Sequence, residues 1–258
     1  MQIISRGDRE MNRLIKAEFF KLSKLRGYRI LLLGAAGIGL AEGLFVILYG
    51  ANAGVEPARR VGYFVLRLYL VWPLFAALMT GIYTAIFLCS EFENRAYGMS
   101  LLCGLSRRKV FLSKMTVFYA GLLPIFYLHV IVVSGIATMG FGFGALTAEE
   151  VAEILKMFLY SVLGYLVLGG YYALIAVWLK NPVATVGVGF LGAYMQMRLR
   201  SALRGVDAPM LNLSFMYQLD QFLDWETFPD GIYLLVMTAT FLLTFSGALF
   251  LYARADLK

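Results

Sequence analysis

Long apolar runs separated by short polar stretches follow one another along the chain after residue 29. A membrane hydrocarbon core of about 30 Å requires about 20 apolar residues per helix. Six segments approach that length, over residues 30–50, 68–89, 115–139, 155–179, 183–197 and 232–253. The pattern therefore predicts an all-α, polytopic membrane protein whose six transmembrane helices form a single transmembrane domain over residues 1–258.

The polar start of the chain has a different pattern. Residues 11–26 read MNRLIKAEFFKLSKLR, with apolar residues on one face of a helix and most of the Lys and Arg residues off that face. Such a helix is typical of the membrane interface, where its basic residues face anionic lipid headgroups. We expect residues 11–29 to form an interfacial helix that contacts lipid on the inner side. Residues 1–10 are expected to be extended or poorly ordered, and Met11 is an alternative initiator.

Small residues recur at four-residue spacing in the first and fifth predicted spans. The residues concerned are Ala35, Gly39, Gly43, Thr185, Gly189 and Ala193. Small side chains allow a second helix backbone to approach closely. The close contact can be packing within one bundle or an interface between two copies of the chain. The presence of two such faces favours a dimer.

The fifth predicted span is short and is followed by an unusual insert. Asn181 and Pro182 are an N-cap and a first-turn residue, so a helix begins there. Residues 198–231 are too polar to span and too apolar for a solvated loop, which predicts extracellular or re-entrant short helices in the outer leaflet. Asp220 and Asp224 share one helical face there. A solvated acidic face is the ordinary interpretation, and contact with a cationic cargo is the alternative.

Charge and composition agree with a membrane protein. The chain is 60% hydrophobic and 15% charged, whereas soluble domains carry about 25% charged residues. The net charge of +7 could suggest nucleic-acid binding, but sixteen of the 23 Lys and Arg residues fall in segments on one side of the predicted spans. This distribution follows the positive-inside rule. It predicts a multi-pass protein of the cell membrane with both termini cytoplasmic and no nucleic-acid partner.

The residues needed for catalysis are missing. The chain contains no GxxxxGK[ST] motif that would hold ATP phosphates. With His129 as its one histidine, it cannot build a zinc protease site with several histidine ligands. Cys89 and Cys103 have no metal or redox spacing and are expected to be free thiols. We therefore expect no enzyme activity, no metal and no cofactor in this chain, and interpret His129 as a packing residue.

Glu42 is the one carboxylate deep in a predicted span. It follows residue 30 by 12 residues, about 18 Å into a core of about 30 Å. A charge at that depth is costly unless it is paired, protonated or facing water, which makes it a functional candidate. It would then contact a polar or cationic cargo. A hydrogen-bonded carboxyl at a helix contact explains the residue equally well.

The longest polar interruption between apolar runs covers residues 91–114, EFENRAYGMSLLCGLSRRKVFLSK. It lies on the predicted cytoplasmic side, between the second and third spans. Residues 93–103 are compatible with a helix that ends at Gly104, and Ser106 then caps the helix that enters the third span.

This loop and the start MNRLIKAEFFKLSKLRGYRILLL resemble the ABC-2 type transporter permease family. The resemblance is greatest to small six-span permeases grouped with bacteriocin-immunity and amphipathic-peptide exporters. The loop residues that carry it are Asn94, Leu101, Leu102, Gly104, Ser106, Arg107, Lys109 and Lys114. The six-span layout extends the match over nearly the whole chain, although Glu42 has no place in the family pattern.

The resemblance implies the transmembrane subunit of an ATP-driven exporter of peptides or other amphipathic molecules. Two identical or related permease chains would pair, and two separate cytoplasmic ATPase subunits would bind ATP and Mg. Residues 11–29 would be a connecting helix, and residues 92–104 a coupling helix seated on the ATPase. The ATPase-coupling residues would be Glu93, Asn94, Tyr97, Leu101, Leu102, Gly104 and Arg107.

A stand-alone secondary transporter or channel is the alternative. Secondary transporters usually show internal repeats and several ionisable groups within the membrane. This chain shows no convincing repeat and one deep carboxylate. The sequence leaves open the cargo, the direction of transport and the identity of the second permease.

Overall fold

The computed structural model describes residues 6–52, 61–70, 72–93, 106–202, 214–221 and 230–254. These residues are almost entirely helical, and no strand occurs among them. The elements are α1 (Arg6–Lys24), α2 (Arg26–Asn52), α3 (Val61–Leu70), α4 (Pro73–Thr84), the π-helical segment η2 (Ala85–Cys89), α5 (Ser90–Glu93), α7 (Arg107–Phe141), α8 (Ala148–Leu179), α9 (Pro182–Ala202), α10 (Phe215–Gln221) and α11 (Asp230–Arg254). The all-α class predicted from the sequence is confirmed.

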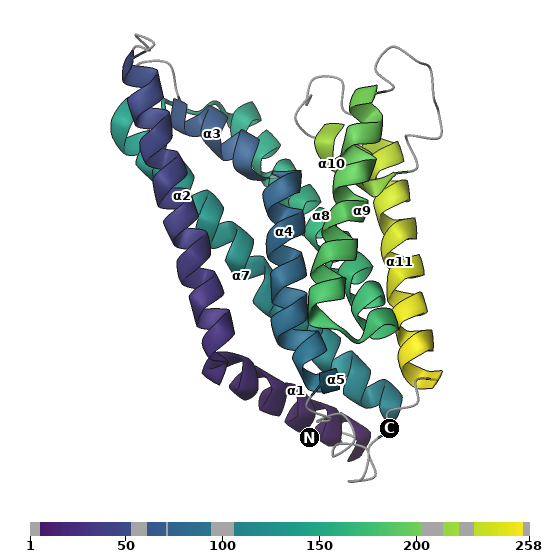
Figure 1. Cartoon of the computed structure of the whole chain (residues 1–258). Helices are drawn as coiled ribbons and strands as arrows, with labels where there is room; N and C mark the ends of the chain where they lie inside the picture. The colour runs from purple at the N-terminus through teal and green to yellow at the C-terminus, as the bar shows by residue number, and fades with distance from the viewer. Residues whose placement is uncertain are drawn as a thin grey trace.

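The long helices run side by side, and α1 crosses one end of the bundle (Figure 1). The C-terminal end of α11 lies at the same end as α1, whereas α3 and α10 lie towards the opposite end. Five helical stretches are long and apolar enough to cross a membrane, at 26–49, 73–92, 107–141, 148–179 and 230–254. The chain is thus a polytopic α-helical membrane protein.

The sixth predicted span corresponds to α9. This helix has 21 residues, and its rise of 1.5 Å per residue gives a length of about 32 Å. It is therefore longer than the 15-residue span predicted from the sequence, but it is less apolar than the five stretches above. Its predicted start is confirmed, because the Ala184 N–H donates to the Asn181 side chain at 2.9 Å. Six membrane crossings stay a prediction.

The second predicted span begins later than the sequence suggested. Residues 68–70 belong to α3, a separate helix packed against α7, and the spanning helix starts at Pro73. Proline disfavours a helical conformation in the residue before it, and Trp72 is extended with φ −89° and ψ 99°. The span predicted from hydropathy included the end of α3 together with α4, because both helices are apolar.

The boundary between the interfacial helix and the first span also differs from the prediction. Residues 6–10 are helical rather than extended, and α1 ends at Lys24. The chain turns at Leu25, and α2 starts at Arg26, so residues 26–29 belong to the first spanning helix. The connecting helix predicted over residues 11–29 therefore corresponds to α1.

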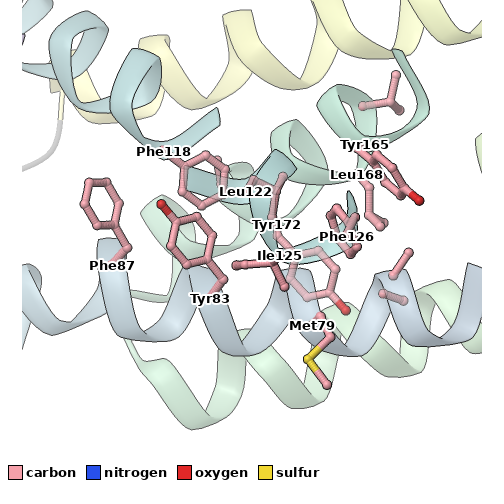
Figure 2. Packing of buried hydrophobic residues seen from close by; sticks show 14 of the residues in the cluster. Met79, Tyr83, Phe87, Phe118, Leu122, Ile125, Phe126, Tyr165, Leu168 and Tyr172 are labelled. Carbon is pink, nitrogen blue, oxygen red and sulfur yellow. The ribbon is translucent and has the colours of Figure 1, made fainter. Parts of the chain in front are cut away.

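Aromatic side chains fill the contact between α4, α7 and α8 (Figure 2). The Tyr83 ring of α4 stacks on Phe118 of α7 with centroids 5.0 Å apart. Phe126 of α7 stacks on Tyr165 of α8 with centroids 4.0 Å apart. Since lipid tails are as apolar as these side chains, close packing rather than water exclusion holds such helices together. Helix α7 thus contacts both α4 and α8 through stacked aromatic rings.

The small face of α2 packs against α7 of the same chain. Ala35 is fully buried. A Cβ atom on Gly39 would lie 2.9 Å from the backbone oxygen of His129, and one on Gly43 would lie 2.7 Å from the Cβ of Ile136. This face therefore serves intrachain packing, the first of the two alternatives left open by the sequence.

The small face of α9 is likewise covered from within the chain. Gly189 lies against the ring of Tyr172 from α8, and Thr185 and Ala193 are fully buried. The Cys89 thiol donates to the Thr185 hydroxyl at 3.4 Å. Helices of the same chain thus cover both small faces, and the dimer interface predicted from them stays a prediction.

The insert at residues 198–231 is described in part. Helix α9 extends to Ala202, and α10 packs on the bundle with Phe215, Met216 and Leu219 buried. Asp220 belongs to α10, whereas Asp224 lies outside the described residues. The contact of these two carboxylates with a cargo stays a prediction.

Candidate functional site

Four charged side chains meet where α1 crosses the end of the bundle. Lys114 of α7 has a side chain that is only 2% exposed. Its Nζ lies 2.9 Å from Oε2 of Glu18 in α1, and it also pairs with Glu91 of α5. Glu91 in turn pairs with Lys21 of α1. We call Glu18, Lys21, Glu91 and Lys114 the ionic cluster; it joins α1, α5 and α7.

The amphipathic pattern of α1 explains how its two members reach the cluster. Glu18 and Lys21 are three residues apart and therefore lie on one side of the helix. Leu22, which is 5% exposed, anchors the same side against the bundle, and a Cβ on Gly121 of α7 would lie 2.7 Å from its Cδ2. Phe20 is 65% exposed on another side. Helix α1 therefore docks on α7 as well as presenting an apolar and basic surface.

The alternating charges offset the free-energy cost of burying Lys114. Buried charges are tolerated when they are paired and hydrogen-bonded, and removing one partner is strongly destabilising. Lys114 has a carboxylate on each side and also lies 5.2 Å from the centre of the Phe87 ring. Burial lowers the pKa of Lys21, and the nearby charge of Lys114 lowers it further, against the opposing effect of Glu18. The cluster is therefore a closely interdependent set of charges.

A π-helical segment ends two residues before the cluster residue Glu91. In η2 the chain departs from α-helical hydrogen bonding over Ala85–Cys89, and α5 follows at once. Single π-helical turns inside α-helices are rare, and those that occur often lie at functional sites. Cys89, which is buried, ends this segment and contacts α9 through Thr185. No pattern in the sequence predicted this distortion. Cys103, the other predicted free thiol, lies outside the described residues.

The predicted coupling helix is mostly outside the described residues. This holds for Asn94, Tyr97, Leu101, Leu102 and Gly104, whereas Glu93 is the last residue of α5. The predicted cap after this segment is confirmed, because the Lys109 N–H donates to the Ser106 hydroxyl at 3.4 Å. Arg107 donates to the backbone oxygen of Ala253 at 3.2 Å and so ties the start of α7 to the end of α11. Its contact with an ATPase stays a prediction.

A second polar pair lies within the bundle. Nε2 of His129 in α7 is 2.8 Å from Oε2 of Glu42 in α2. The His129 side chain is 1% exposed and the Glu42 side chain 20% exposed. The Phe75 ring stacks on the imidazole with centroids 3.9 Å apart. The pair fits the hydrogen-bonded carboxyl considered in the sequence analysis, and it gives His129 a partner that the sequence alone could not identify.

Both polar groups join residues that are far apart along the chain, which explains why the sequence did not predict that these residues pair. Glu42 and His129 are 87 residues apart, and Lys114 is 96 residues from Glu18. One signal was available, because Glu18 lies between Ile15 and Leu22 on the apolar side of α1. A carboxylate in that position needs a cation from the surface on which the helix docks.

No metal site supplements these groups in the part of the chain that is described. Within it, no three His, Cys, Asp or Glu residues lie close enough together to hold an ion. The chemistry of the site is therefore that of paired charges and hydrogen bonds between helices.

These features define a multi-pass α-helical membrane protein in which an amphipathic helix is tied to the spanning bundle by buried charges. A family model described as ABC-2 family transporter protein matches residues 14–196. The chain therefore belongs to the ABC-2 family of transporter proteins, as the sequence resemblance indicated. No curated protein matches the chain.

The matched region extends from α1 into α9 and contains both polar groups described above. Family membership makes the chain a permease subunit of an ABC transporter, a transport subunit of the cell membrane, and implies association with an ABC ATPase.

Proposed function

We propose that this permease is half of an exporter of amphipathic molecules, peptides among them, and that the ionic cluster transmits movement from the ATPase to the bundle. The observation that carries the second part is the position of Lys114. One buried cation on α7 pairs with Glu18 on α1 and with Glu91 at the start of the loop between two spans.

The mechanism follows from which elements share these pairs. A separate ATPase, binding ATP and Mg, contacts the loop segment at residues 92–104 from the cytoplasm. A displacement of that segment moves Glu91, which immediately precedes it. Because Glu91 is paired with both Lys114 and Lys21, α7 and α1 follow as a packed unit. Close-packed elements shift between discrete arrangements rather than deform gradually, so such a displacement reaches the spanning helices.

The proposed assembly contains two permease chains, identical or related, and two ATPase subunits. Since the small faces of α2 and α9 are covered, the second permease is proposed to contact their outer faces. Gly34 and Gly37 on α2 and Gly187 on α9 have nothing within 4 Å of where a Cβ would lie. A neighbouring helix could approach the backbone closely at these positions. The stand-alone transporter or channel loses support, because family membership implies an ATPase partner.

Reconstitution tests the proposal. The tagged permease should retain an ABC ATPase on purification, and proteoliposomes containing both should move an amphipathic peptide only when ATP is supplied. The same vesicles with a hydrolysis-deficient ATPase serve as the control. Peptide movement by the permease alone, driven by an ion gradient, would favour the secondary transporter.

A further inference from the structure

Glu42 occupies an unusual depth for a carboxylate. It lies 16 residues after the start of α2, about 24 Å along that helix. The other carboxylates described on the spanning helices lie near their ends, such as Glu91 at one end and Asp230 at the other. An ionisable group deep in a membrane bundle is expensive to maintain and commonly marks a functional position.

The contacts of Glu42 leave part of its carboxylate available. Oε2 is paired with His129, whereas Oε1 has no hydrogen-bond partner within the described residues. A carboxylate can accept about four hydrogen bonds, so one imidazole does not satisfy it. The pair is also asymmetric in burial, since the His129 side chain is 1% exposed and that of Glu42 is 20% exposed. The histidine therefore holds the carboxylate from the inside and leaves its outer side accessible.

Aromatic rings surround the imidazole of the pair. Tyr69 and Trp72 have ring centroids 5.5 Å and 6.3 Å from that of His129, and they contact each other edge to face at 5.0 Å. Both side chains are only partly buried. The faces of aromatic rings, of Trp above all, attract cations, and the attraction increases away from water. A carboxylate beside such rings favours a positively charged ligand.

The backbone is interrupted at the same place. Helix α3 ends at Leu70 and α4 starts at Pro73, and Trp72 between them is extended. At membrane depth, non-helical backbone is tolerated where it is buried in protein or lines a water-filled cavity, and broken helices often form the binding sites of transporters. The interruption brings Trp72 and Phe75 to the imidazole of His129.

The surroundings of Glu42 on α2 are apolar and exposed. Phe45, three residues on and therefore on the same side of α2 as Glu42, is 66% exposed, so the accessible side of the carboxylate adjoins an exposed apolar surface. A ligand that reaches it there must be compatible with both a hydrocarbon surface and a negative charge. We propose that Glu42, Tyr69 and Trp72 bind the cationic group of an amphipathic ligand at the interruption between α3 and α4.

A purely structural role is the competing explanation. The Glu42–His129 pair would then only hold α2 against α7, and no ligand would depend on it. The two explanations predict different cation binding. A purely structural pair would give no saturable cation binding that depends on Trp72. The proposal rests on the exporter function only in regarding the ligand as cargo, since binding itself needs no ATPase.

Tetraphenylphosphonium and tetraphenylborate are suitable probes, because they share a shape and differ in the sign of their charge. Their binding would be measured on the full chain in phosphatidylcholine nanodiscs, after subtraction of the signal from protein-free nanodiscs. Each ion would be measured separately; the wild type should bind the cation saturably and should not bind the anion in this way. Glu42→Gln should weaken binding about tenfold or more, because it removes the charge and retains the shape. Trp72→Leu should weaken binding severalfold and leaves the carboxylate in place.

Glu149→Gln is the matched control, since it removes an exposed carboxylate in the first turn of α8 and should bind like the wild type. Thermal unfolding of each variant separates lost binding from lost folding, and Trp72→Leu decides the matter if Glu42→Gln fails to fold. No saturable cation binding, equal binding of the anion, or binding unchanged in either site variant would overturn the proposal. None of these results would affect the test of ATPase dependence, so the two proposals can fail separately.

Discussion

Lys114 shows how a single residue can connect distant parts of this chain. Its cation is almost fully buried and is stabilised by carboxylates from two other helices. In an ion pair of this kind the partners are costly to separate, although the pair as a whole contributes little stability compared with apolar packing. The residue therefore specifies an arrangement of α1, α5 and α7 rather than simply strengthening it.

Lys114→Met should lower the stability of the protein by about 3–5 kcal/mol, because the nearby carboxylates lose their buried cation. Thermal unfolding in detergent measures the effect. Arg108→Met is the control, since it removes an exposed charge six residues away on the same helix and should change stability little. The double variant Lys114→Met/Glu91→Met should regain most of the loss, because it also removes a buried negative charge. A single variant as stable as the wild type would contradict the pairing.

Gly39→Leu should destabilise the monomer by about 1–3 kcal/mol, because the added side chain meets the backbone of α7 rather than a flexible group. Gly37→Leu is the matched control on the same helix, where nothing lies within 4 Å of the new Cβ. It should preserve stability and weaken pairing between two copies.

Thermal unfolding and crosslinking together distinguish these two outcomes. If Gly39→Leu left stability intact and only separated dimers, the covered face would be an interface between copies, and the intrachain packing would be wrong.

At the scale of elements, hydropathy predicted the spanning helices well because apolar length is a direct requirement of the bilayer. It failed where an apolar stretch is interrupted, because a length criterion does not register that Pro73 prevents Trp72 from being helical. Capping signals were more reliable, and both Ser106 and Asn181 cap the helices predicted from them.

The candidate site was predicted less completely than the fold. Single residues such as Glu42 and His129 stood out by type and depth, but their pairing depends on which helices are neighbours. Small-residue spacing likewise indicated that a helix packs on Gly39 without indicating which helix. These contacts are set by tertiary packing between segments far apart in sequence, and no local pattern encodes them.

The loop segment at residues 92–104 provides the prediction at this scale. Replacing Leu101 and Leu102 with Asp keeps the basic residues that follow, so insertion should be normal. It removes apolar contacts with an ATPase groove, each worth about 1.5–3 kcal/mol if fully buried. Co-purification of the ATPase should therefore be lost. Replacement of the same residues with Met retains apolar contacts and should preserve it. An Asp variant that binds the ATPase normally would reduce the loop to a connector.

At the scale of the whole molecule, the described helices form one packed bundle with α1 attached across its end (Figure 1). The end of α11 joins the start of α7 through Arg107, close in sequence to the segment that leads to Lys114. Helices α1 and α11 thus both reach the end of the bundle that carries Glu91, where the ATPase is proposed to bind. A force applied there reaches α7, which packs chiefly against α2, α3 and α1.

The ratio of peptide transported to ATP hydrolysed, measured in proteoliposomes containing the permease and its ATPase, tests the central claim most directly. The comparison is between the wild type, Arg108→Met and the double variant Lys114→Met/Glu91→Met, which removes the cluster's link between α7 and α5 with little loss of stability. We predict that the double variant continues to hydrolyse ATP while transport per ATP falls at least severalfold, and that Arg108→Met matches the wild type. An unchanged ratio in a folded, ATPase-bound double variant would contradict the role of the ionic cluster in coupling.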